Sequence, residues 1–416
     1  MLNASDTAPA ATVASAEVDT LRFATAGSVD DGKSTLVGRL LHDSKSVLSD
    51  QLDAVELASR NRGWSVPDLA LLTDGLRAER EQGITIDVAY RYFATPRRRF
   101  ILADTPGHVQ YTRNMVTGAS TADLAVILAD AQSGIVDQTR RHAAIAALLR
   151  VPHLVLAVNK MDLADYDHPR FKEVAAEFTA YAAGLGLPEI TAIPVCALLG
   201  DNVVTPSAAM NWYHGPTLLE HLETVPVTHE TAAAPPRFPV QYVIRHAGIR
   251  HYAGQLVSGR LCVEDAVTVM PSGRTTTITS LDVLGHHVTT AHTPQSLSLR
   301  LADDIDVARG DLIVSASSPP PLAQEFTADV CHLADKPLRP GDRVLLKHTT
   351  RTVLALVADL HNTAQLGAND LASVTLRTAQ PIAVDPYANN RRTGSFLLID
   401  PADGATLTAG MARPPA

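Results

Sequence analysis

Residues 27–34 carry the pattern G-x-x-x-x-G-K-S, which is typical of a phosphate-binding loop. The stretch before it, 21–26, is apolar and strand-like, and the stretch after it, 35–41, is helix-like. In that setting the glycines let backbone N–H groups turn toward a phosphate chain at the positive end of a helix dipole. We expect Lys33 to reach the β- and γ-phosphates and the Ser34 hydroxyl to join a magnesium shell. The sequence therefore predicts a nucleoside triphosphate site, whose contacts in this loop are Gly27, Asp30, Asp31, Gly32, Lys33, Ser34 and Thr35.

The base of the nucleotide is indicated by the sequence N-K-M-D at 159–162, which follows the strand-like run 154–158. The Asp162 carboxylate can accept hydrogen bonds from N1–H and the 2-amino group of guanine. Adenine lacks that donor pair and would leave the carboxylate unpaired. We expect Asn159 to hold the loop and reach the purine N7, and the Lys160 stem to lie over the ring. The predicted nucleotide is GTP.

A second loop completes the predicted base site. The segment Cys196, Ala197 and Leu198 follows the strand-like run 192–195 and matches the loop whose backbone N–H groups usually contact the guanine O6. The first residue of that loop is usually serine, so Cys196 is a departure. Because main-chain groups make the contact, we expect the departure to cost little.

Two further segments are candidates for hydrolysis. In D-T-P-G-H at 104–108, we expect Asp104 to hold magnesium through water and the Gly107 N–H to bond the γ-phosphate. His108 is expected to orient the attacking water, in preference to a plain histidine in a polar loop. Thr85, in G-I-T-I at 83–86, can close on magnesium and the γ-phosphate. The predicted catalytic residues are thus Lys33, Thr85 and His108, and the predicted magnesium ligands are Ser34, Thr85 and Asp104.

The strings between these motifs indicate which GTPase family is involved. HVQYTRNM at 108–115 and GASTAD at 118–123 resemble the elongation-factor-Tu class of GTPases. Five more strings resemble the large, GTP-binding subunit of bacterial sulfate adenylyltransferase: EREQGITIDVAYRYF at 79–93, DQTRRH at 137–142, LLGDN at 198–202, FPVQYV at 238–243 and TGSF at 393–396. The likeness runs from about residue 20 to about residue 410.

The resemblance implies a subunit of a heterodimeric enzyme or a higher assembly. In it, a separate small catalytic subunit makes adenosine 5′-phosphosulfate and pyrophosphate from ATP and sulfate, and this chain hydrolyses GTP to drive that reaction. Coupling requires that the GTP and GDP states bind the small subunit or its intermediates differently. Some members of the family carry a fused adenylylsulfate kinase with a second phosphate loop. No such loop follows residue 41, so we expect no kinase activity from this chain.

Two alternatives from other classes stay open at this stage. A translation factor would need a basic RNA-facing surface, and the net charge of −9 and sequence pI of about 5.9 speak weakly against one. The three arginines at 97–99 are better explained as a solvated hairpin than as a nucleic-acid contact. A regulatory GTPase with another partner is the second alternative.

Composition and patterning predict an α/β P-loop GTPase domain, with a mostly parallel doubly wound sheet, followed by two small β-barrel domains. The expected ranges are a disordered tail at 1–19, the GTP-binding domain at 20–228, and barrels at 236–316 and 323–410. No apolar run is long enough to span a membrane. Three widely spaced cysteines favour a reduced cytoplasmic protein and no metal cluster.

Overall fold

The computed structural model describes residues 19–47, 49–61, 67–72, 88–107, 112–187, 190–227, 233–246 and 248–414. The predicted residues Thr85 and His108 lie outside these ranges. No helix in the described ranges is both long and apolar enough to cross a membrane.

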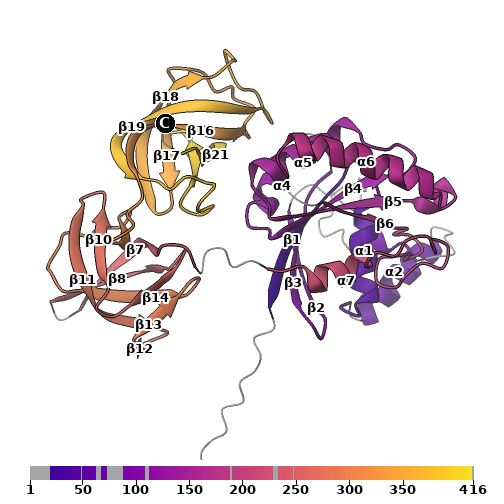
Figure 1. Cartoon of the computed structure of the whole chain (residues 1–416), viewed down its shortest axis with the longest axis horizontal. Coiled ribbons are helices and arrows are strands. Elements are labelled where there is room, and N and C mark those ends of the chain that lie inside the picture. Colours follow the sequence, from indigo (N-terminus) through magenta and orange to yellow (C-terminus); the bar gives the residue numbers. More distant parts are fainter. Residues whose placement is uncertain are drawn as a thin grey trace, which may run out of the picture.

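The first domain is built on a six-stranded sheet with the order β2-β3-β1-β4-β5-β6 (Figure 1). Only β2 runs antiparallel to its neighbour, and the remaining pairings are parallel. The central strand β4 is buried along its whole length, as its unbroken apolar sequence requires. The strands are β1 (Thr20–Ala26), β2 (Ala89–Ala94), β3 (Arg99–Asp104), β4 (Leu124–Asp130), β5 (His153–Asn159) and β6 (Ile190–Pro194).

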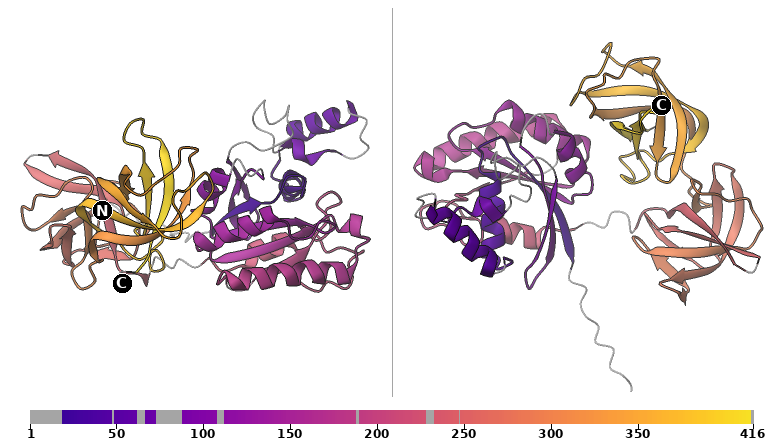
Figure 2. Two further views of the ribbon diagram at one scale, coloured as in Figure 1. Left: turned by 90° about the horizontal axis from the view of Figure 1, so that it is seen from above. Right: turned by 180° about the vertical axis from the view of Figure 1, so that it is seen from behind.

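Helices cover both faces of this sheet, which makes the domain doubly wound (Figure 2). One hydrophobic cluster joins one face to α4 (Thr112–Ala119), α5 (Asp137–Leu148) and α6 (His168–Gly184). The other cluster joins the opposite face to α1 (Lys33–Asp43) and α7 (Leu218–Thr224). The remaining helical segments are α2 (Ser49–Asn61) and the 3-10 turns η1 (Leu69–Leu72) and η3 (Met161–Ala164).

The second domain is a β-barrel. The strands β10-β15-β7-β8-β14-β11 form a ring that closes through the pairing of β10 with β11, and β12 extends from β11. Apolar side chains that alternate along these strands fill its interior. The strands are β7 (Arg237–His246), β8 (Ile249–Gln255), β9 (Arg260–Cys262), β10 (Ala266–Met270), β11 (Arg274–Val283), β12 (His286–Val288), β13 (Thr290–His292), β14 (Ser296–Leu301) and β15 (Leu312–Ser315).

The third domain is a closed barrel with the order β16-β19-β18-β17-β20-β21. Its strands are β16 (Leu322–His332), β17 (Arg343–His348), β18 (Arg351–Leu360), β19 (Leu371–Ala383), β20 (Ser395–Ile399) and β21 (Thr406–Ala412). The predicted fold class, a GTPase domain followed by two barrels, is therefore confirmed.

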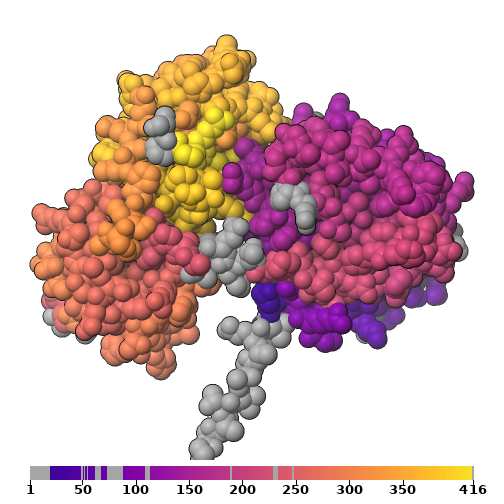
Figure 3. All heavy atoms as spheres, in the orientation of Figure 1, coloured from indigo at the N-terminus to yellow at the C-terminus, as the bar shows by residue number. Residues whose placement is uncertain are grey.

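The third domain contacts both the first and the second domain (Figure 3). Its Asp385 accepts two hydrogen bonds from Arg237 of the second domain, at 2.8 and 2.9 Å. Its Tyr387 hydroxyl donates to the Leu149 carbonyl of the first domain at 2.9 Å, and Arg391 donates to the Ala122 and Ser120 carbonyls. The contact with the first domain therefore includes the residues that directly follow α4.

The arginines at 97–99 lie at the hairpin between β2 and β3, as expected. Arg98 itself departs from the solvated hairpin that the sequence indicates, because it is buried and donates to the Leu222 and Val225 carbonyls. It ties this hairpin to the end of α7.

Candidate functional site

The predicted site residues that lie in the described ranges gather at one edge of the sheet. Thr25 in β1 is the register partner of Asp104 in β3, and Asp130 in β4 is the partner of Asn159 in β5. Because these four strands are parallel, their carboxyl ends meet at the same edge, where ligands bind in folds of this kind. The phosphate loop directly follows β1 at that edge.

The phosphate loop has the geometry of an anion site. Gly32 caps the N-terminus of α1 with φ of 85°, and Asp30 has φ of 69°. A Cβ on Gly32 would lie 2.5 Å from the amide nitrogen of Asn159, so no side chain fits there. Within the described chain, no side chain caps α1 and its first turn holds no acidic residue. The helix therefore presents backbone N–H groups and a positive dipole end that suit a phosphate.

Lys33 and Asp104 form a buried ion pair in this loop. The Lys33 ammonium lies 2.5 Å from Oδ1 of Asp104, and the two side chains are only 6% and 1% exposed. Thr25 also donates to this Oδ1, at 3.3 Å. Oδ2 of Asp104 is buried without a hydrogen-bond partner among the described residues. A buried carboxylate oxygen with an unused lone pair, on an aspartate that pairs with the residue preceding Ser34, fits a magnesium ion or its water ligand.

The segment after β3 packs directly on the phosphate loop. A Cβ on Gly107 would lie 2.5 Å from the carbonyl oxygen of Gly27, so only glycine allows this approach. The structure thus brings Asp104 and Gly107 to the phosphate loop.

Asn159 ties the two halves of the site together. Its amide nitrogen donates to the Asp31 carbonyl at 2.7 Å, and its amide oxygen accepts from the Ala197 N–H at 3.0 Å. The side chain is 2% exposed. One residue therefore connects the phosphate loop with the loop that is expected to contact the guanine O6.

Lys160 follows in a left-handed conformation, with φ of 59°, and donates to Oδ2 of Asp130 at 2.9 Å. Burial disfavours the charged form of Asp130, but the hydrogen bonds from Lys160 and from the Gln132 N–H outweigh this and lower the pKa of Asp130. The ion pair thus ties the N-K-M-D turn to the last residue of β4.

The Cys196 side chain has a contact that sequence reasoning missed. Its thiol donates to Oδ1 of Asp162 at 3.0 Å. Burial, reinforced by that hydrogen bond, raises the pKa of the Cys196 thiol to about 12, so the thiol keeps its proton at neutral pH. Cys196 therefore orients the carboxylate expected to read the base, a task that a serine hydroxyl can also perform.

Arg39 was also missed. It projects from α1, and its guanidinium donates to the carbonyls of Ala197 at 3.2 Å and Leu198 at 2.5 Å. In the sequence it is one basic residue in an amphipathic helix, with no signal that separates it from a solvated arginine.

Asp31 faces its own loop. Its carboxylate accepts a 2.6 Å hydrogen bond from the Ser28 N–H. Burial raises the pKa of Asp31 to about 6, against the effect of the Ser28 N–H, and the charge of Asp130 adds to the rise. Asp30, next to it, is exposed.

Comparisons with known families agree with this geometry. The profile of the elongation factor Tu GTP binding domain matches residues 19–230, and that of the GTP-eEF1A C-terminal domain-like family matches 325–413. The first match spans half of the chain and the whole candidate site. The fold and the site thus define a GTP-binding protein of the elongation factor Tu class.

Closer relatives narrow this class. The chain is 46% identical to sulfate adenylyltransferase subunit 1 of Cellvibrio japonicus, over 94% of this chain and 86% of the relative, and 48% identical to that of Methylorubrum populi, over 95% and 87%. It is 54% identical to the bifunctional enzyme CysN/CysC of Mycobacterium tuberculosis, over 94% of this chain but 67% of the relative. A solved structure of sup35 complexed with GDP aligns over 96% of this chain and 94% of that one at 22% identity, and its TM-score of 0.43 is too low to add to the assignment.

The chain belongs to the sulfate adenylyltransferase subunit 1 family. The predicted family resemblance is thus confirmed. The function class is a GTPase of sulfate activation rather than a translation factor.

Proposed function

We propose that this chain hydrolyses GTP to drive the formation of adenosine 5′-phosphosulfate and pyrophosphate from ATP and sulfate on a separate small subunit. The main support is the likeness to sulfate adenylyltransferase subunit 1 over 94% of the chain. A driver is needed because the phosphosulfate anhydride is higher in energy than the phosphoanhydride bond that it replaces. Hydrolysis of GTP to GDP and phosphate releases the free energy that the first reaction lacks.

In this proposal, different residues bind the phosphates, the guanine base and the magnesium ion. Gly27, Gly32, Lys33 and Thr35 bind the phosphates, and Asn159, Lys160 and Asp162 select guanine with the loop at 196–198. Ser34, Thr85 and Asp104 would hold a magnesium ion, which neutralises charge on the β- and γ-phosphates when bound. Lys33 can transfer its contact from Asp104 to the phosphates, because it belongs to the phosphate loop and its ammonium is held there by Asp104.

The segments around Thr85 and Gly107 carry out GTP hydrolysis and couple it to the reaction on the small subunit. His108 orients the attacking water, and the Gly107 N–H senses whether the γ-phosphate is present. A His108→Ala substitution is expected to leave GTP binding near normal and slow hydrolysis by about a hundredfold or more. A variant that hydrolyses GTP like the parent would contradict the role given to His108.

The partner is the small catalytic subunit, in a heterodimer or a higher assembly, and neither nucleic acid nor a membrane is required. We place this complex in the cytoplasm, where GTP, ATP and reduced cysteines coexist. The described cysteines Cys196, Cys262 and Cys331 are free thiols.

The test is pyrophosphate release from ATP and sulfate by this chain purified with the small subunit of the same organism. It is measured with GTP and with a non-hydrolysable analogue. We expect sulfate-dependent release that collapses with the analogue. GTP hydrolysis without any complex or sulfate-dependent release would instead indicate a regulatory GTPase with another partner.

A further inference from the structure

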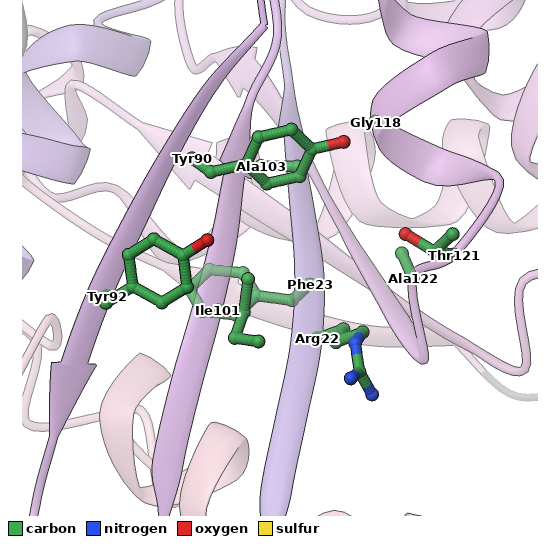
Figure 4. A pocket seen from close by; sticks show the side chains of 9 residues that line it. All are labelled: Arg22, Phe23, Tyr90, Tyr92, Ile101, Ala103, Gly118, Thr121 and Ala122. Atoms are coloured by element: carbon green, nitrogen blue, oxygen red, sulfur yellow. The ribbon is translucent and has the colours of Figure 1, made fainter. Parts of the chain in front are cut away.

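One face of the sheet carries exposed aromatic side chains at the β2 edge (Figure 4). Tyr90 and Tyr92 of β2 are 45% and 71% exposed. They lie opposite Ala103 and Ile101 of β3, and Ile101 in turn lies opposite Arg22 of β1. The Tyr90 ring extends from β2 across β3 toward β1, the Tyr92 ring extends from β2 toward β3, and both residues border a cavity of about 230 Å³. We refer to Arg22, Tyr90, Tyr92, Arg99 and Ile101 as the aromatic–arginine face.

The core does not account for these tyrosines. Successive side chains of a strand point to opposite faces, and the other face of the same strands already buries Phe23, Phe93 and Phe100. Phe93 stacks on Phe100 at 4.6 Å between centroids, and Phe23 meets each of them edge-on at 6.2 and 6.3 Å. That buried cluster secures the three strands, so the exposed rings are surplus to the fold. Exposed aromatic rings on a rigid sheet are characteristic of protein interfaces.

The charges on the face indicate the chemistry of its partner. Neither Arg22 nor Arg99 forms an ion pair with any residue in the described ranges, although the whole chain carries a net charge of −9. Arg392 of the third domain lies near Arg22 and adds a positive charge beside this face; burial lowers the pKa of its guanidinium, and repulsion from Arg22 and Arg391 lowers it further. Asp123 is an acidic residue close to Arg392, and one of its oxygens already accepts from the Arg22 N–H. A partner that carries both acidic and apolar side chains would complement this surface.

The face is also connected to both segments proposed to respond to the γ-phosphate. β2 begins at Ala89, four residues after Thr85, and α4 begins at Thr112, four residues after His108. Gly118, Thr121 and Ala122, at and just beyond the end of α4, form the far wall of the cavity. A partner bound here would therefore touch two elements that continue directly from the nucleotide-sensing segments.

We propose that the aromatic–arginine face is the surface on which the small catalytic subunit docks, through a segment that carries acidic and apolar side chains. This inference rests on the proposed function. It assigns the docking position to the first domain rather than to either barrel. Through this face, the nucleotide state of the first domain can alter its affinity for the small subunit.

The test is the dissociation constant of the full chain for the small subunit, measured in the presence of GTP for the parent and three variants. Tyr92→Glu is expected to weaken binding by about tenfold or more, because it removes an aromatic contact and adds a charge of the partner's sign. Arg99→Glu, which leaves the aromatic rings in place, is expected to weaken binding and to flatten its dependence on salt. Tyr242→Glu is the matched control, because Tyr242 is 66% exposed on β7 of the second domain; its affinity should equal that of the parent.

GTP affinity and the oligomeric state of each variant are measured alongside, and all variants should bind GTP like the parent. If the parent binds the small subunit, and the dissociation constants of Tyr92→Glu and Arg99→Glu both lie within about twofold of the parent's, the inference is overturned and the proposed function stays intact. Weakening by Tyr242→Glu alone would also overturn it, by moving the docking surface to the second domain. A change in self-association by Tyr92→Glu would overturn it in favour of a second copy of this chain. A parent chain that does not bind the small subunit would refute the proposed function itself.

Discussion

The two ends of the candidate nucleotide site are built differently. At the base end, both polar atoms of the Asn159 amide are hydrogen-bonded, the Cys196 thiol orients Asp162, and Arg39 braces the 196–198 loop. At the phosphate end, Lys33 and Asp104 are buried against each other, and Oδ2 of Asp104 has no partner in the described part of the chain. The base end is organised within the protein. At the phosphate end, the contact between Lys33 and Asp104 can be replaced by contacts of each residue with a ligand, the phosphates for Lys33 and a metal ion for Asp104.

This contrast implies different penalties when each end is altered. Removing one member of a buried ion pair leaves an uncompensated charge, which is costly for folding as well as for binding. Removing one hydrogen bond from the base end disturbs orientation while the remaining contacts hold the loops. The largest effects should therefore come from the phosphate end.

Lys33→Ala is expected to abolish measurable GTP binding and to lower the free energy of unfolding by about 3–5 kcal/mol, because the Asp104 carboxyl group stays buried without its ion-pair partner. Titration calorimetry measures the loss of GTP binding, and urea unfolding measures the change in the free energy of unfolding. The double variant Lys33→Ala/Asp104→Asn should recover much of the stability but not the binding. A stability for the single variant equal to the parent's would show that the ion pair is not a substantial buried charge pair.

Cys196→Ala is expected to weaken GTP and GDP binding equally, by about fivefold to tenfold, the effect of losing roughly 1 kcal/mol of hydrogen bonding to Asp162. Cys196→Ser should bind at least as tightly as the parent, since a hydroxyl is a better donor than a thiol. The two dissociation constants of each variant provide the measurement. If alanine and serine give the same affinity, Cys196 does not orient Asp162.

The raised pKa of Asp31 should make the free energy of unfolding depend on pH. Its pKa is raised from 3.8 to about 6 by burial, so between pH 4 and 6 the folded chain holds a proton that the unfolded chain has released. Stability from this group is thus present at low pH and is lost as the pH rises to 6, by about 3 kcal/mol at most. Asp31→Asn keeps an oxygen for the Ser28 N–H and should lack this part of the pH dependence. Urea unfolding from pH 4 to 7.5 compares the two proteins, and parallel curves would exclude the effect.

The sequence was sufficient for the parts of the site that follow strand ends in a fixed order. The phosphate loop, Asp104 and Asn159–Asp162 all meet at the predicted edge, because parallel strands bring their carboxyl ends together. The contacts of Arg39 and Cys196 could not be predicted in this way. Each depends on how a helix or a loop approaches a segment 34 or more residues away. The roles of Thr85 and His108 stay predictions.

The central claim is that GTP in this chain's own site drives sulfate activation on the other subunit, and exchanging the base tests it most directly. Asp162→Asn replaces one acceptor with an N–H donor, which suits the 2-carbonyl group of xanthine in place of the 2-amino group of guanine. In the complex with the small subunit, we predict that sulfate-dependent pyrophosphate release by this variant needs xanthosine triphosphate and no longer responds to GTP. The parent complex should behave in the opposite way. Release that still follows GTP in the variant, or that is indifferent to either nucleotide, would contradict the claim.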